Sequence, residues 1–176
     1  MKRKICELIL IIVFFVFQCT LGRAIAIGGV SPNFMIILPV IFGFLNGRNE
    51  GIYVGLICGL FYDLFSYDII GFSSLTMMYA GYASGFFYQK YEEKEFILPL
   101  LLVGVSSLAF GFISFVGNFL LHNKLDVVFY IGRIVIPEVV YTVCVTLLIY
   151  QLLAFLNRHF EGNRRKRAKS FDERNI

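Results

Sequence analysis

The chain has 176 residues, of which 58% are apolar and 16% are charged, and its mean hydropathy is +0.75. A soluble domain of this length needs a charged surface, yet few charges lie between Ile5 and Leu156. The charges form short clusters between long apolar runs, a pattern typical of a polytopic helical membrane protein. The net charge of +4 comes mostly from a cluster after the last apolar run, so it does not indicate nucleic-acid binding.

Six apolar segments follow one another along the chain and predict a bundle of about six transmembrane helices. A span needs roughly 20 apolar residues, so the third segment is short. The second contains Gly28-Gly29, Pro32 and Pro39, and we expect it to be kinked or broken. The predicted spans cover residues 5–21, 24–45, 51–65, 69–88, 96–121 and 131–156. They predict an all-α membrane domain over residues 1–157, followed by a basic tail over 158–176.

The distribution of lysine and arginine predicts the orientation of these spans. With the N-terminus in the cytoplasm, most of the 16 basic residues lie inside, and only Arg23, Lys124 and Arg133 lie outside. An even number of spans places the two basic ends of the chain on the same side. We therefore expect a multi-pass protein of the bacterial cell membrane with both termini in the cytoplasm.

The N-terminus also resembles a cleavable secretion signal, because a basic MKRK precedes an apolar run and the small residues Ala24-Ile25-Ala26. Cleavage would leave five spans and keep the C-terminal tail inside. Gln18, Thr20 and Arg23 fit poorly before such a cleavage site. We therefore expect the first segment to be retained as a span.

A row of glycines in the third span leads to a carboxylate. Residues four apart share a helix face, so Gly51, Gly55, Gly59 and Asp63 form one row. Such a row lets another helix backbone approach closely, which predicts a protein-facing surface rather than a lipid-facing one. The same spacing occurs at Gly81 and Gly85. These faces pack inside the bundle or receive a partner's membrane helix.

Further small and polar residues recur at three- and four-residue steps in the fifth span, the spacing of a left-handed helix seam. They are Gly104, Ser107, Gly111, Ser114 and Asn118. Internal packing of the bundle is the simpler interpretation. A docking face for another protein's helix is the alternative.

Depth along the helices predicts a polar cluster near the outer membrane face. Asp63 lies about 18 Å beyond the inner start of its span, by helix rise. Arg133 begins the sixth span at the outer surface, Glu138 follows it, and Arg23 ends the first span on that side. We predict that Arg23, Asp63, Arg133 and Glu138 gather there, where a buried pair fixes helix register or binds a ligand.

Nothing in the sequence indicates an enzyme, a cofactor or a metal site. The chain shows no nucleophile–base–acid set and no phosphate loop. Its four cysteines form no CxxC pair, and His122 and His159 lie far apart in sequence. The basic tail predicts a topology anchor that attracts anionic lipid, and a specific protein contact is the alternative. Its basic residues are Arg164, Arg165, Lys166, Arg167 and Lys169.

Several of these residues also carry a family resemblance, which is specific over about residues 30–88 and compositional elsewhere. The ordered features are Pro32-Asn33, the turn Asn46-Gly47-Arg48-Asn49-Glu50-Gly51, the series Gly55, Gly59-Leu60 and Asp63, then Gly71, Gly81-Tyr82 and Gly85. In this combination the sequence resembles the rod shape-determining protein MreD family of bacteria.

The resemblance implies a non-enzymatic membrane scaffold of the cell-elongation machinery that synthesises peptidoglycan. It implies an MreC-like single-span membrane partner, and beyond it the actin-like MreB and a peptidoglycan synthase pair. The family is similar in fold to the substrate-binding subunits of energy-coupling-factor transporters. A vitamin-type transporter subunit is therefore the alternative function, although the first span lacks the alanine row by which such subunits dock.

Overall fold

The computed structural model describes residues 2–24, 30–66, 71–88, 97–122 and 131–172. Within these ranges the chain forms helices and no β-strand. Their bounds are α1 Lys2–Ala24, α2 Phe34–Asn46, α3 Arg48–Ser66, α4 Phe72–Ser84, the 3₁₀ turn η1 Gly85–Phe87, α5 Ile97–His122, the π-helical turn η2 Ile131–Val135 and α7 Ile136–Asp172.

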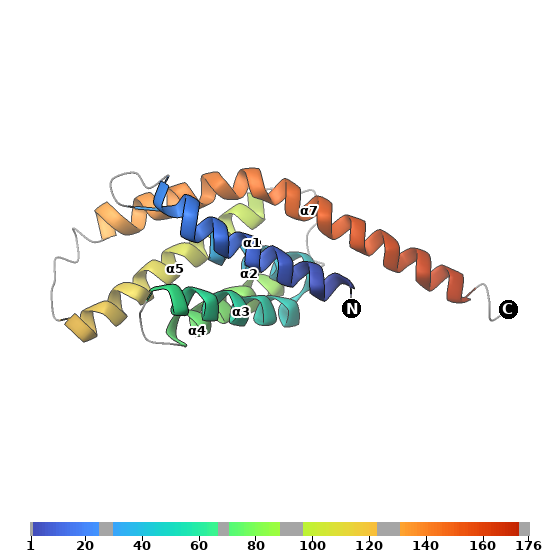
Figure 1. Ribbon diagram of the computed structural model, residues 1–176, viewed down its shortest axis with the longest axis horizontal. Helices are drawn as coiled ribbons and strands as arrows, with labels where there is room; N and C mark the ends of the chain where they lie inside the picture. Colours follow the sequence, from blue (N-terminus) through green and yellow to red (C-terminus); the bar gives the residue numbers. More distant parts are fainter. Residues whose placement is uncertain (1, 25–29, 67–70, 89–96, 123–130, 173–176) are drawn as a thin grey trace.

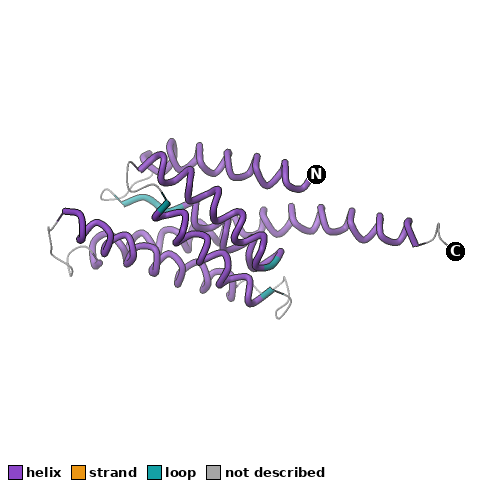
Figure 2. Tube along the Cα trace, turned by 90° about the horizontal axis from the view of Figure 1, so that it is seen from below, coloured by secondary structure: helices purple, strands orange, loops and turns teal. Residues whose placement is uncertain are grey.

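The helices run side by side as an elongated bundle (Figures 1 and 2). α2, α3 and α4 pack most closely on one another, α5 pairs with α7, and α1 lies against α2 and α3. Both views place the start of α1 and the C-terminal half of α7 toward the same end of the molecule. The described part of the protein is thus an all-helical bundle, and the start of α1 and the end of α7 lie at the same end of it.

The core of the bundle is α2, a helix of 13 residues in which every residue from Phe34 to Leu45 is buried. Residues 31–33 before it are not helical, because Pro32 disfavours helical geometry in the residue before it. Pro39 is accommodated within α2. The expected break of the second segment therefore falls at Pro32-Asn33, and its backward helical extension through residues 31–33 does not form.

Glycines let α3 and α4 approach to backbone contact. A methyl group added at Gly55 would lie 2.5 Å from the carbonyl oxygen of Met77, closer than real Cβ contacts. Gly51 lies directly against Gly81, and a Cβ at either position would overlap the other's backbone. Gly59 meets the backbone of Ser74 in the same way. Without side chains between them, the two helices gain dispersion contacts along their whole length.

The turn between α2 and α3 depends on a glycine with positive φ. Gly47 has φ +97°, a conformation that side chains rarely adopt, and it packs against the ring of Tyr88. Directly after this turn, Arg48 packs against Gly85: a Cβ at Gly85 would lie 2.5 Å from the Cα of Arg48. The first residue of α3 is therefore held against the end of α4.

Two helices are long and apolar enough to cross a membrane, among the residues that the structure describes. They are Ile97–Val116 in α5 and Gly132–Phe155 in η2 and α7. That the other four predicted spans also cross the membrane stays a prediction. α7 does not end with the apolar segment: it continues as one helix to Asp172, through the basic residues of the predicted tail.

The glycine contacts predict opposite effects for the same substitution at two positions. Gly59→Ala should lower the melting temperature in detergent and cost about 1–3 kcal/mol, because the new methyl group overlaps the Ser74 backbone. Gly104→Ala is the matched control, since its Cβ would meet only a Val143 methyl group at 3.4 Å. That change should be neutral or stabilise the helix by up to about 1 kcal/mol. Equal effects of both variants would contradict the close α3–α4 packing.

Candidate functional site

The carboxylate of Asp63 hydrogen-bonds to the beginning of α4. Its Oδ2 accepts from the Gly71 N–H at 2.8 Å and from the Ser74 N–H at 3.3 Å, and Oδ1 accepts from the Ser73 N–H at 3.1 Å. The Ser74 hydroxyl donates to Oδ2 at 2.9 Å. Asp63 is 1% exposed, so these four donors replace water as its solvation.

This arrangement is a helix cap supplied from another helix. The first N–H groups of any α-helix lack partners within the helix, and Gly71, which precedes α4 with φ +100°, has no side chain to offer. A carboxylate at the positive end of the α4 dipole is also electrostatically favourable. Asp63 therefore connects the end of α3 to the start of α4.

A second polar node caps the start of α2 with residues from three helices. Asn33 Oδ1 accepts from the Ile36 N–H at 3.3 Å, and Gln18 Oε1 of α1 accepts from the Phe34 N–H at 2.7 Å. The Asn33 N–H donates to Thr142 Oγ1 of α7 at 3.0 Å. The start of the core helix is thus bonded to both α1 and α7.

Two side chains on α7 complete this node. The Thr142 hydroxyl donates to the carbonyl oxygen of Glu138 at 2.7 Å, so it accepts and donates at once. The Glu138 carboxyl group interacts with the Asn33 side chain, although Asn33 Nδ2 does not reach hydrogen-bond geometry with it. Thr146 lies one turn further along α7, and within the described part of the chain its hydroxyl bonds only to the Thr142 carbonyl, at 2.6 Å.

Charged residues gather at the end of the bundle where α1 begins. Lys4 Nζ lies 2.6 Å from Glu50 Oε2 on α3 and 3.7 Å from Glu7 Oε2 on its own helix. The same ammonium group lies 4.9 Å from the centre of the Tyr53 ring. These contacts hold the start of α1 against the start of α3.

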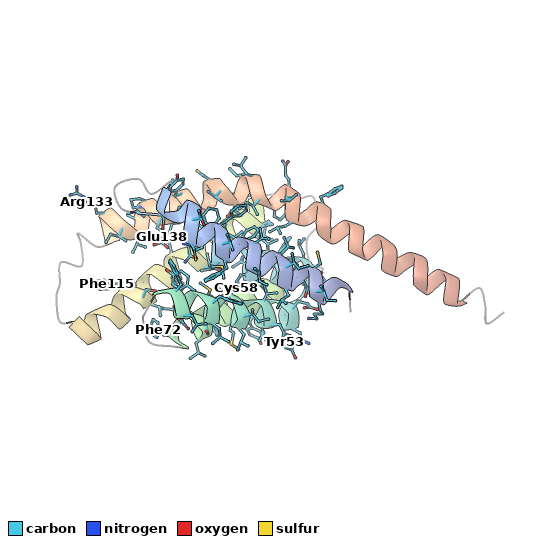
Figure 3. The ribbon with its side chains drawn as sticks, in the orientation of Figure 1. Tyr53, Cys58, Phe72, Phe115, Arg133 and Glu138 are labelled. Atoms are coloured by element: carbon cyan, nitrogen blue, oxygen red, sulfur yellow. The ribbon has the colours of Figure 1, made fainter. Side chains whose placement is uncertain are left out.

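Two of the four residues in the predicted outer cluster, Asp63 and Glu138, contact different parts of the bundle. Asp63 hydrogen-bonds only to α4 among the described residues. Figure 3 shows Phe72 at the start of α4 and Arg133 on opposite sides of the bundle, with Arg133 directed away from it. Glu138 lies at Asn33 instead, and the side chain of Arg23 falls outside the described part. The side chains of the basic tail, Arg164 to Lys169, fall outside it too.

The glycine faces are occupied from within the chain. Gly51, Gly55 and Gly59 face α4, Gly81 faces Gly51, and Gly85 faces Arg48. In the fifth span, Gly104 faces Val143 of α7 and Gly111 faces Val135 of η2. Internal packing therefore uses the surfaces that the sequence also offered to a partner.

The bonds of Gln18 and Thr142 to the start of α2, and of Asp63 to the start of α4, were not predicted from the sequence. Only Asn33 carried a usable signal, since an asparagine directly before an apolar run is a common N-cap. The other three come from distant parts of the chain, and no local pattern pairs them. Among the described residues, no three His, Cys, Asp or Glu side chains lie close enough to hold a metal ion.

The chain matches a known protein family. A family model for the rod shape-determining protein MreD matches residues 2–160, which is nearly its whole length. The chain belongs to the MreD family. The resemblance seen in the sequence is thereby confirmed, and the family is one of non-catalytic membrane proteins that determine rod shape. No curated protein and no solved structure matches the chain.

The Asp63 cap of this MreD-family protein predicts which substitutions at other residues change the energetic effect of mutating Asp63. Asp63→Ala should cost several kcal/mol in detergent, because buried N–H donors lose their acceptor at about 1–3 kcal/mol each. Asp63→Asn should cost less, since one acceptor oxygen remains. In double-mutant cycles on unfolding free energy, Asp63→Asn should couple to Ser74→Ala and add independently to Arg133→Gln. Strong coupling of Asp63→Asn to Arg133→Gln would instead show that Asp63 and Arg133 form an ion pair in the outer cluster.

Two equally buried threonines on α7, of which only Thr142 bonds Asn33, allow a second test. Thr142→Val removes the acceptor of the buried Asn33 N–H and should cost about 1–3 kcal/mol in unfolding free energy. Thr146→Val is the control, because it is equally buried and on the same helix but bonds only within α7. It should change stability by less than about 1 kcal/mol. The node is ruled out if the two variants unfold alike.

Proposed function

We propose that this protein is a non-enzymatic scaffold of the cell-elongation machinery that holds an MreC-like membrane partner through helix faces within the bilayer. The family match over residues 2–160 is the observation that carries the proposal. Through that partner the scaffold connects to MreB and to the peptidoglycan synthase pair. Both termini lie in the cytoplasm, and the basic tail attracts anionic lipid.

The packing of the bundle supports a particular contact face. The glycine rows are filled by α3 and α4 themselves, so a partner helix must use another surface. In each of the two clear spans, only 28% of the most apolar stretch is buried inside the molecule. We therefore assign the partner to the outward faces of α5 and α7. Large apolar side chains cover these faces, among them Leu101, Val105, Phe112, Leu147 and Leu148.

The transporter alternative is not favoured. The family match supports shape determination, and no observation of the described residues points to a transported ligand.

Affinity purification from mild detergent tests the scaffold itself. Recovery of a single-span, coiled-coil MreC-like protein with the full-length chain is the expected result. Recovery of paired ATPases in its place would identify a transporter subunit. Rod-shaped cells depleted of the chain should become round, and the wild-type gene should restore them.

Photo-cross-linking in cells tests the contact face. A photoreactive residue at Leu101 on α5 or Leu148 on α7 should cross-link to the MreC-like protein. The matched controls are Leu64 on α3 and Leu75 on α4, which are 64% and 69% exposed, comparable to 57% and 81% at the test positions. Cross-links confined to Leu64 and Leu75 would move the contact to the α3–α4 side.

A further inference from the structure

The guanidinium group of Arg48 is held over aromatic rings at the end of the bundle where α1 begins. Its Cζ lies 3.8 Å from the centre of the Phe86 ring and 5.8 Å from that of Tyr82. The two rings contact each other edge to face, with centres 5.0 Å apart. Because the backbone of Arg48 also packs on Gly85, both ends of this side chain are restrained.

The charge of this group is not neutralised by the described residues. Arg48 is exposed, and it makes cation–π contacts but no hydrogen bond or ion pair with the described part of the chain. Glu50, two residues further along α3, is bonded to Lys4 instead. A stacked guanidinium keeps its N–H donors in a plane at the ring's edge, in the geometry that receives two oxygens of a phosphate.

The surface beside Arg48 continues as an apolar face of α4. Leu75, Tyr79, Tyr82 and Phe86 are spaced four, three and four residues apart, so they lie on one side of the helix. Leu75 is 69% and Tyr79 is 73% exposed, and the rings of Tyr79 and Tyr82 lie 6.4 Å apart. A phosphate bound at Arg48 would therefore sit at the head of an apolar track suited to an acyl chain.

We propose that Arg48, Tyr82 and Phe86 form a binding site for the phosphodiester group of a phospholipid, with an acyl chain along Tyr79 and Leu75. The continuous apolar track selects a lipid over free phosphate. The site is separate from the basic tail and independent of the proposed scaffold role. It places one ordered lipid on the α3–α4 side, away from the face assigned to a partner.

Native mass spectrometry of the full-length protein tests this site. Arg164, Arg165, Lys166, Arg167 and Lys169 are first changed to glutamine, so that the tail contributes less to lipid binding. The delipidated protein is then titrated with phosphatidylglycerol, with diacylglycerol of the same chains, or with inorganic phosphate. We expect one phosphatidylglycerol to be retained, and neither diacylglycerol nor phosphate alone.

Point variants in this background locate the site. Arg48→Gln should weaken phosphatidylglycerol retention by about tenfold, the loss of a charge-assisted hydrogen-bonded pair. Arg48→Lys keeps the charge but not the planar fork, and Phe86→Leu keeps the apolar surface but not the ring, so both should show intermediate losses. Arg133→Gln, an exposed arginine at the other end of the bundle, should change nothing.

The comparison uses only variants whose melting temperature without lipid matches that of the parent, and Arg48→Lys replaces Arg48→Gln if the latter does not fold. Retention unchanged in the Arg48 variants would overturn the site. If diacylglycerol is retained as well as phosphatidylglycerol, the site does not recognise the phosphate group. If inorganic phosphate binds as well as phosphatidylglycerol, the site does not select a lipid.

Discussion

The structure depends on one constraint: helix ends that lie within an apolar environment must find hydrogen-bond partners inside the protein. Water satisfies the first N–H groups of a helix at a protein surface, but a hydrocarbon layer supplies none. Two helices here, α2 and α4, begin close to buried polar side chains. Other helices supply part of each cap: Gln18 accepts from the first N–H of α2, Thr142 bonds the N-cap residue Asn33, and Asp63 caps α4.

These caps determine which helices can be neighbours. A cap from the same segment would leave a helix free to slide or rotate against its neighbours. A cap donated by α1, α3 or α7 fixes the relative height of the two helices, because a hydrogen bond near 3 Å tolerates little displacement. The glycine contacts then bring α3 and α4 together at that height, with Gly51 against Gly81 and Gly59 against Ser74. The capping residues thus set the relative height of the helices, and the glycines set how closely α3 and α4 approach.

The packing of the helices also determines which surfaces remain exposed to other molecules. The close-packed unit of α2, α3 and α4 uses its small residues internally, whereas α5 and α7 bury little of their apolar area. This division separates a closely packed core of α2, α3 and α4 from a face of exposed apolar side chains on α5 and α7. The exposed arginine at the start of α3 marks a third kind of surface, where a charge and aromatic rings meet at the end of the bundle.

Much of this protein was determined by local sequence. The apolar runs specify helices because buried backbone must be hydrogen-bonded within each segment, and Pro32-Asn33 specifies where the core helix begins. The four-residue glycine spacing specifies close-packed faces, and the ordered motifs around Arg48 and Asp63 specify the family. Only the tertiary structure decided which groups meet. Depth along the helices placed Asp63 and Arg133 in one outer cluster, but depth says nothing of rotation about the helix axis or of which helices are adjacent. Those depend on contacts between residues far apart in the chain, so the nearest donors to Asp63 are the N–H groups of α4.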